Sequence, residues 1–465
     1  MKKSLLWIVV LILSISMVAA FSLYGCKAEE AAVEEEAVEE APTEEVPEVE
    51  EEVVEEETTV ETWTPDPDEA SGVVTIWYWD QAGFETMWNK FTEVYPNVEL
   101  NYVALNSADY LDKIQTSITG GLELPDILLG EIDPRGKLLT FDIWENLDAE
   151  PYNVDRSKLM DFVVPLGTNP EGELAGIDNL MCPAGLAYKA PLAKEYFGTD
   201  DPDELSAMLP DWDTFIEEGK EVKEKSGGSV YMFATIFDAW RVLFGQNPQP
   251  MFDGNKLINI DVFEEVFTRV VEMMDAGLLD ALATWSPSWF SSFTDDNHVF
   301  YPCSSWGPQF VIQPNDPDSE GRWRVMVPPE GGYYYGGTIW GVWNESKVKD
   351  AAWAYINWTI FGDGADVYRE ELGYFVPRKD LYAGEFDYSP YDDPYFGGQN
   401  VKELLFKTIA PELQVRPVTK YDESVNDVIN LVLLQIEKEG ITADEALQNF
   451  KAELPNMIPD VEIVE

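Results

Sequence analysis

The chain of 465 residues carries 88 acidic and 30 basic side chains, which gives a formal net charge of −58 at pH 7. Nucleic acids and polyphosphates are bound through clustered lysine and arginine, so this charge argues against both as partners. With one histidine, no C-x-x-C pair, no P-loop and no G-x-S-x-G elbow, the sequence predicts neither a metal nor a cofactor.

The first 26 residues have the layout of an export signal. Lys2 and Lys3 precede an apolar run that begins at Leu5, and no second hydrophobic span follows it. Leu23-Tyr24-Gly25-Cys26 is similar to a lipobox, which implies cleavage before Cys26 and a lipid on its sulfur. We therefore expect an exported protein, lipid-anchored to the cell membrane and facing the periplasm or the cell exterior. An ordinary secretory signal and a retained N-terminal anchor are the alternatives.

Residues 27–70 are predicted to form an acidic, disordered tether. The segment from Glu29 to Ala70 contains 20 acidic side chains and neither lysine nor arginine. Charges of one sign without an apolar period bury too little surface to offset the entropy of ordering. Such a segment would space a folded domain from a membrane.

The residues from Ser71 onward are too many for one small core and predict two lobes. A β-rich run, Val73 to Trp79, is followed by apolar residues at helical spacing, and Pro96 ends this element. A second strand from Val98 to Ala104 and a helix from Tyr110 to Ile118 complete a βαβα start, which indicates a parallel sheet. Open α/β sheets bind ligands at the carboxyl ends of their strands, where Trp79 and Asp80 fall.

The stretch from Tyr333 to Phe361 combines three tyrosines, a Gly336-Gly337 turn, a strand from Thr338 to Trp343 and a helix. The helix is expected to bury one face, formed by Val348, Ala351, Ala352, Tyr355 and Thr359, and to stop at Gly362. Glycine beside aromatic rings lets the backbone approach a flat ligand edged with hydroxyls. A core strand and helix rich in aromatics is the alternative.

The GG-x-x-W-G strand and the KDAAWAYINW helix resemble the solute-binding proteins of bacterial ABC importers. The similarity is to the carbohydrate-binding group of the maltose-binding type (family 1). It extends in order over residues 72–455, through these segments: Leu124–Leu128, Tyr188–Leu192, Leu209–Phe215, Val299–Gly307, Arg416–Ile436 and the helix start at Thr442.

The resemblance implies an α/β, two-lobe fold of the periplasmic-binding-protein type (type II), with a hinge and a central ligand cleft. Residues 72–181 and 333–400 would form the first lobe, and residues 182–332 and 401–465 the second. Such a protein captures a sugar or oligosaccharide by lobe closure and delivers it to the permease subunits in the membrane. It is a monomer and not an enzyme.

The resemblance also implies ligand contacts from both lobes. Stacking aromatics are expected at Trp79, Trp240, Trp306 and Tyr421, with Tyr335 and Trp340 as further aromatics, and polar contacts at Asp80, Glu131, Asp133 and Arg135. The same alignment puts Cys182 and Cys303 on second-lobe strands near the cleft. Export permits a disulfide between them, and two buried free thiols are the alternative.

Two other functions remain compatible with the residues. A glycoside-acting enzyme needs only two carboxylates, which this acidic chain has in excess. A binding protein for a cationic, non-sugar ligand would also suit the charge. A surface-coat protein would explain the N-terminus but not the order of elements for two lobes.

Overall fold

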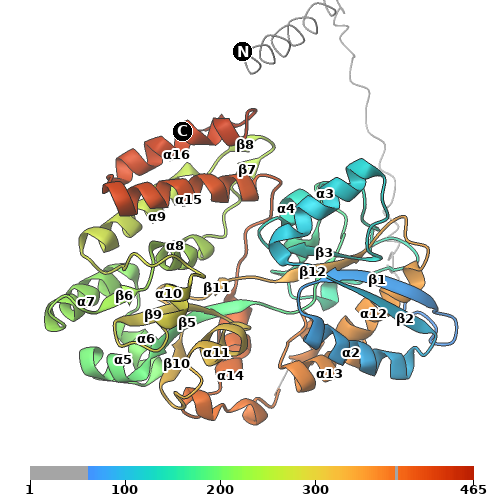
Figure 1. Ribbon diagram of the computed structural model, residues 1–465, viewed down its shortest axis with the longest axis horizontal. Coiled ribbons are helices and arrows are strands. Elements are labelled where there is room, and N and C mark those ends of the chain that lie inside the picture. The colour runs from blue at the N-terminus through green and yellow to red at the C-terminus, as the bar shows by residue number, and fades with distance from the viewer. Residues whose placement is uncertain (1–60, 383–385, 465) are drawn as a thin grey trace, which may run out of the picture. The chain divides into compact units, whose positions relative to one another are not determined.

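The computed structural model describes residues 61–382 and 386–464. The expected signal, Cys26 and most of the expected tether lie outside the described residues. The described chain is a mixed α/β structure built on two main sheets, which lie apart in Figure 1. Among its helices, none is long and apolar enough to cross a membrane.

The first sheet contains five strands in the order β2-β1-β3-β12-β4. The predicted βαβα start is present as β1 (Gly72–Tyr78), α2 (Gln81–Val94), β2 (Val98–Ala104) and α3 (Tyr110–Gly120). As predicted, β1 pairs in parallel with β2, and also with β3 (Ile127–Glu131). The late strand β12 (Thr338–Val342) is antiparallel to β3 and to the short β4 (Ile177–Asp178), so a distant part of the chain completes this sheet.

Helix α12 (Lys349–Ile360) follows β12 as predicted, but the prediction that it buries one face is wrong. Every residue from Ala351 to Ile360 is buried. The helix packs on β1, β12, α2 and α13 (Gly364–Leu372), which together surround it. A helix that is covered on all sides has no polar face. The spacing of its apolar residues therefore could not predict that the other faces are buried as well.

The end of the expected tether packs against the first sheet's helices. The Trp63 carbonyl accepts hydrogen bonds from Trp353 Nε1 at 2.9 Å and from Asn357 Nδ2 at 3.2 Å, both on α12. Its N–H donates to the Tyr152 carbonyl at 2.9 Å, and Ala70 is buried. Residues 61–70 therefore belong to the folded part, because their backbone groups find partners that composition alone did not show.

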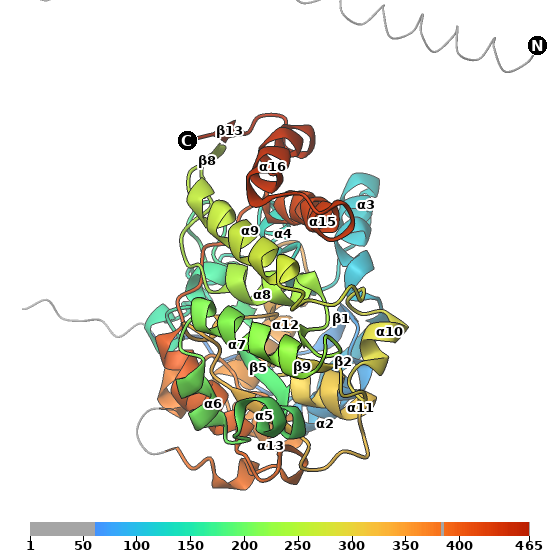
Figure 2. The same cartoon turned by 90° about the vertical axis from the view of Figure 1, so that its left-hand side faces the viewer.

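The second sheet has the order β10-β5-β9-β6, with β11 (Tyr333–Tyr334) added to β5. Its long strands are β5 (Pro183–Lys189) and β9 (His298–Ser304), flanked by β6 (Tyr231–Phe233) and β10 (Trp323–Met326). Figure 2 shows α7 (Trp212–Lys225), α8 (Ile236–Gly245) and α9 (Ile260–Asp275) in front of this sheet.

The last two helices complete the apolar core beside the second sheet. Helices α15 (Asp422–Glu439) and α16 (Ala443–Met457) contact each other, and α16 contacts α9. The predicted capping box is present, because Thr442 and Glu445 exchange their side-chain and backbone hydrogen bonds. Phe450 of α16 stacks on Phe263 of α9 with 4.4 Å between ring centroids.

Cys182 and Cys303 are free and buried. The structure therefore contains two buried thiols, which was the alternative to a disulfide. Cys303 on β9 lies opposite Gly185 on β5, three residues beyond Cys182. Successive side chains of a strand point to opposite faces, so this odd offset directs the two thiols away from each other. Burial raises the pKa of the Cys303 thiol to about 12.

Candidate functional site

Two adjoining cavities lie between residues of the first sheet's loops and residues of the second. One encloses about 290 Å³, and we call it the arginine cavity because Arg241 and Arg416 line it. The other encloses about 400 Å³, and we call it the tryptophan cavity because Trp285 and Trp306 line it. Both are lined by Asp133, Tyr335 and Arg241, so they form one continuous cleft.

The aromatic wall of the arginine cavity comes from α8. Thr235 caps this helix by accepting hydrogen bonds from the N–H groups of Phe237 and Asp238. Four-residue spacing then stacks Trp240 on Phe244, with ring centroids 4.9 Å apart. The Arg416 guanidinium lies 3.8 Å from the Phe244 ring centroid and donates to the Phe244 carbonyl at 3.0 Å. A flat apolar surface with hydrogen-bond donors at its edge results.

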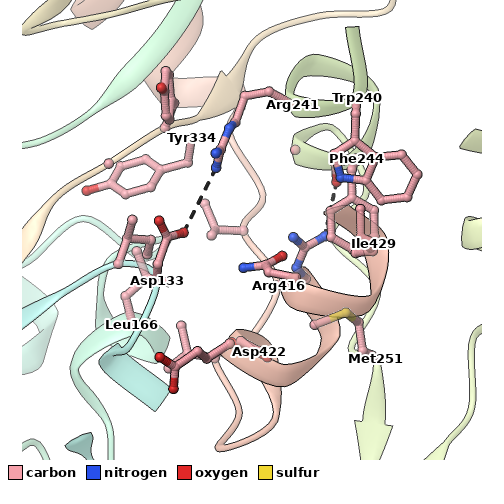
Figure 3. Close-up of a pocket in the computed structure, with 18 of the residues that line it drawn as sticks. Asp133, Leu166, Trp240, Arg241, Phe244, Met251, Tyr334, Arg416, Asp422 and Ile429 are labelled. Atoms are coloured by element: carbon pink, nitrogen blue, oxygen red, sulfur yellow. Dashed lines mark hydrogen bonds and ion pairs between the residues drawn. The ribbon is translucent and has the colours of Figure 1, made fainter. Parts of the chain in front are cut away.

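The opposite wall is acidic. Asp133, in the loop after β3, faces Arg241 at 4.0 Å, and Figure 3 shows this ion pair bridging the space between the two walls. The Arg241 guanidinium also lies 4.8 Å from the Tyr335 ring centroid. Three more carboxylates, Asp422, Glu423 and Asp427, come from the first turns of α15. The four acids outnumber the two arginines, so the arginine cavity disfavours an anionic ligand.

Burial shifts the pKa of several lining groups. It raises the pKa of Glu131 to about 7, with a further rise from the neighbouring charge of Asp133. Burial likewise raises the pKa of Asp422, whose carboxylate accepts the Thr419 N–H at 2.9 Å. It lowers the pKa of the Arg416 guanidinium to about 10. The cleft therefore holds its charged groups in partly desolvated positions, where polar contacts are stronger than in water.

The tryptophan cavity is bounded by Trp306, two residues after β9. The Trp306 indole N–H donates to the Tyr335 carbonyl at 3.1 Å, in the segment that joins β11 to β12. Gly336 in that segment has φ +102°, and a Cβ there would lie 2.6 Å from Trp306 Nε1. Glycine is therefore required at this position for the close approach of backbone and ring. Ser107, Ala108 and Leu111 form the facing wall.

Five of the residues expected to contact ligand line these cavities: Glu131, Asp133, Trp240, Trp306 and Tyr335. Three others do not line either cavity. Trp79 packs against Tyr78 and Tyr110, Asp80 caps α2 by accepting the Gly83 N–H, and Tyr421 contacts the Phe252 ring.

The positions of Arg135 and Trp340 correct their expected ligand roles. The Arg135 side chain is fully buried, pairs with Asp178 through its two terminal guanidinium nitrogens at 2.7 and 3.2 Å, and donates from Nε to the Gly130 carbonyl. Trp340 is 1% exposed and packs on Tyr355, with 5.4 Å between ring centroids. The void that Trp340 lines with Asp80 encloses about 10 Å³, far less than a sugar needs. Both side chains support the fold of the first lobe.

Sequence reasoning missed Arg241, Arg416 and Trp285. Arg241 follows Trp240 directly, and Arg416 begins the C-terminal segment that resembles the family. Their position beside residues already expected at the site was the one signal that could have identified them. The contact of Arg416 with Phe244 joins residues 172 positions apart, which no local pattern predicts. Nothing in the sequence distinguishes Trp285 from the other tryptophans.

The described residues bring no group of three or more His, Cys, Asp or Glu side chains into a metal-binding arrangement. The cleft offers flat apolar walls, hydrogen-bond donors and carboxylates contributed from both sides. Such a site suits reversible binding of a polar small molecule.

Solved structures share the two-lobe α/β fold. An extracellular solute-binding protein of family 1 superposes with a TM-score of 0.74 at 20% identity, over 83% of this chain and 99% of that one. The sugar-binding protein MalE from Xanthomonas citri superposes with a TM-score of 0.66 at 17% identity, over 83% and 98%. The predicted fold class is confirmed.

The particular family follows from the sequence. Residues 86–391 match the model of the bacterial extracellular solute-binding proteins, and the chain belongs to this family. A lactose-binding protein of Rhizobium radiobacter is 26% identical over 411 residues, which are 83% of this chain and 93% of that protein. The family resemblance seen in the sequence is thereby confirmed. An arabinooligosaccharide-binding protein of Halalkalibacterium halodurans is 23% identical over 279 residues, which are 54% of this chain and 61% of that protein.

Proposed function

We propose that the protein captures a neutral sugar or oligosaccharide between its lobes and delivers it to the permease of an ABC importer. The observation that carries this proposal is the cleft, where aromatic faces and polar groups from both sheets line one continuous space. Sugar rings stack their apolar faces on aromatic rings, and their hydroxyls bind to charged groups at the edges. The relatives named for lactose and arabinooligosaccharides support the ligand class.

Within this proposal, Trp240, Trp306 and Tyr335 stack on sugar rings, and Glu131, Asp133, Arg241 and Arg416 bind hydroxyls. The expected bounds, 72–181 and 333–400 for the first lobe and 182–332 and 401–465 for the second, need correction at both ends of 333–400. Tyr333–Tyr334 pair with β5, and the Gln399 side chain bonds to the Val325 backbone of β10, so both ends of this segment belong with the second lobe. The connections after β4, after β11 and around Val415 form the hinge. Ligand contacts made by both lobes stabilise the closed form over the open one, and no bond is made or broken.

A thermal-shift screen tests the ligand class. Lactose, maltose, arabinobiose and larger neutral oligosaccharides form one panel, and spermidine and putrescine form the second. A ligand that binds only the folded state raises the melting temperature. Stabilisation by a sugar, with the sugar recovered chemically unchanged, supports the proposal.

A response to the polyamines alone would show that the ligand is cationic rather than a sugar. The excess of carboxylates in the arginine cavity makes such a ligand the second candidate. Release of a hydrolysed product would instead establish an enzyme.

We further propose that Cys26 carries a lipid that holds the mature protein at the membrane. Replacement of Cys26 by Ser is expected to move the protein from the membrane fraction to the soluble fraction, because the thiol is the site of modification. Mass spectrometry of the mature N-terminus checks this directly. Cleavage elsewhere without a lipid would contradict it. We also propose that the protein is a monomer, and size-exclusion chromatography with light scattering tests this.

A further inference from the structure

Trp285 combines two unfavourable features beside the cleft. Its side chain is 50% exposed, among the most exposed of the large apolar residues in the described chain. Its backbone has φ 63°, in the left-handed region that a bulky side chain rarely occupies. Exposure forgoes apolar burial, and the backbone conformation adds strain. Neither feature stabilises the fold, and both are features that a binding role would explain.

Neighbouring aromatic rings fix the position of the Trp285 indole. It stacks on Trp306 with 6.3 Å between ring centroids and 23° between ring planes. It also packs at 5.2 Å against Trp289, in α10 (Pro287–Ser291). Trp289 is buried, and its indole N–H donates to the buried Asp238 carboxylate at 3.2 Å. We call Trp285, Trp289 and Trp306 the tryptophan shelf.

The shelf faces an open space of suitable chemistry. Trp285 and Trp306 line the tryptophan cavity together with Ser107, Ala108, Leu111 and Glu131. The indole rings match the apolar face of a sugar ring, and the Ser107 hydroxyl and the Glu131 carboxylate match its hydroxyl edge. The arginine cavity has its own aromatic wall, formed by Trp240 and Phe244.

Two cavities with separate aromatic walls indicate two places for rings. They enclose about 290 and 400 Å³ and meet at Asp133, Arg241 and Tyr335. Pockets for drug-sized ligands span roughly 300–1,000 Å³, so one ring leaves much of the combined space unfilled. We propose that Trp285 stacks on the second ring of a neutral oligosaccharide whose first ring occupies the arginine cavity. This inference rests on the proposed function and adds that the ligand has at least two rings.

Titration calorimetry of the full protein tests the inference with three variants. Lactose, maltose and arabinobiose serve as probes, each compared with its component monosaccharides. Replacement of Trp285 by Ala is expected to weaken binding of the preferred disaccharide about tenfold, the loss of one ring stack, and to leave monosaccharide affinity unchanged. Trp285→Tyr retains a stacking ring and should recover most of the affinity. Phe310→Ala is the matched control, because Phe310 is 47% exposed and lines neither cavity.

Melting curves complete the test. Trp285→Gly removes the ring and accepts positive φ without strain, so it should melt no lower than the natural protein while binding the disaccharide as weakly as Trp285→Ala. Equal loss for mono- and disaccharide, or no loss for the disaccharide, would overturn the role of Trp285 while leaving the proposed function in place. Failure of the unaltered protein to bind any sugar would instead overturn the proposed function, and the inference with it.

Discussion

Two aromatic clusters of similar composition have different surroundings. In the first lobe, Trp340, Tyr355, Phe84 and Trp88 pack with ring centroids 4.9 to 6.0 Å apart, and all are buried. At the cleft, Trp306 contacts both Trp285 and Tyr335, but each of the three keeps surface open to the tryptophan cavity. Helices α2 and α12 supply Phe84, Trp88 and Tyr355 and pack these rings over Trp340 of β12. The difference between core and binding surface therefore depends on which elements pack over the rings.

The largest effect is expected in the first-lobe cluster. Trp340→Ala should lower the free energy of unfolding by about 3–5 kcal/mol, because a buried indole leaves a cavity that the surrounding rings cannot fill. Molecules that still fold should bind sugar with unchanged affinity. Chemical denaturation and calorimetry measure the two quantities. Lost affinity with unchanged stability would place Trp340 in the binding site and remove the distinction between the clusters.

Trp306→Ala should show the reverse pattern at an intermediate size. Loss of a stacking ring is expected to cost about 1–3 kcal/mol of binding free energy, roughly five- to 150-fold in affinity. Stability should change less than in Trp340→Ala, because Trp306 is only partly buried. Calorimetry and melting curves on both variants give a direct contrast. A strongly lowered melting temperature with unchanged ligand affinity would assign Trp306 to the core.

The smallest effect concerns Glu131 at the edge of the cleft. Its folded-state pKa of about 7 lies above the usual value, so the folded protein holds this proton more tightly than the unfolded chain. Its contribution to stability is therefore present at low pH and is lost as the pH rises from about 4.5 through 7.

Glu131→Gln removes this titration. The stability difference between the variant and the natural protein should shift in favour of Gln across that range, by less than about 1 kcal/mol given solvent screening. Denaturation curves at several pH values measure it. A difference that stays constant from pH 4.5 to 7 would show that Glu131 has an ordinary pKa.

The sequence predicted what depends on local pattern. The parallel start of the first sheet, the helix after β12 and the capping box at Thr442 follow from spacing and propensity. The burial of Trp340 and the exposure of Trp285 could not be predicted, because each depends on segments distant in the chain. The role of Arg416 likewise arises only when its guanidinium reaches α8, 172 residues away.

The docking of Trp63 determines where a mechanical load would enter the protein. The Trp63 carbonyl and N–H are bonded to α12 and to Tyr152, all within the first lobe. A pull transmitted along the chain from the N-terminal side therefore acts first on this lobe. The second lobe would bear the load only through the connections between the lobes. An anchor upstream of residue 61 would thus hold the first lobe in place and leave the second lobe free to rotate over the bound solute.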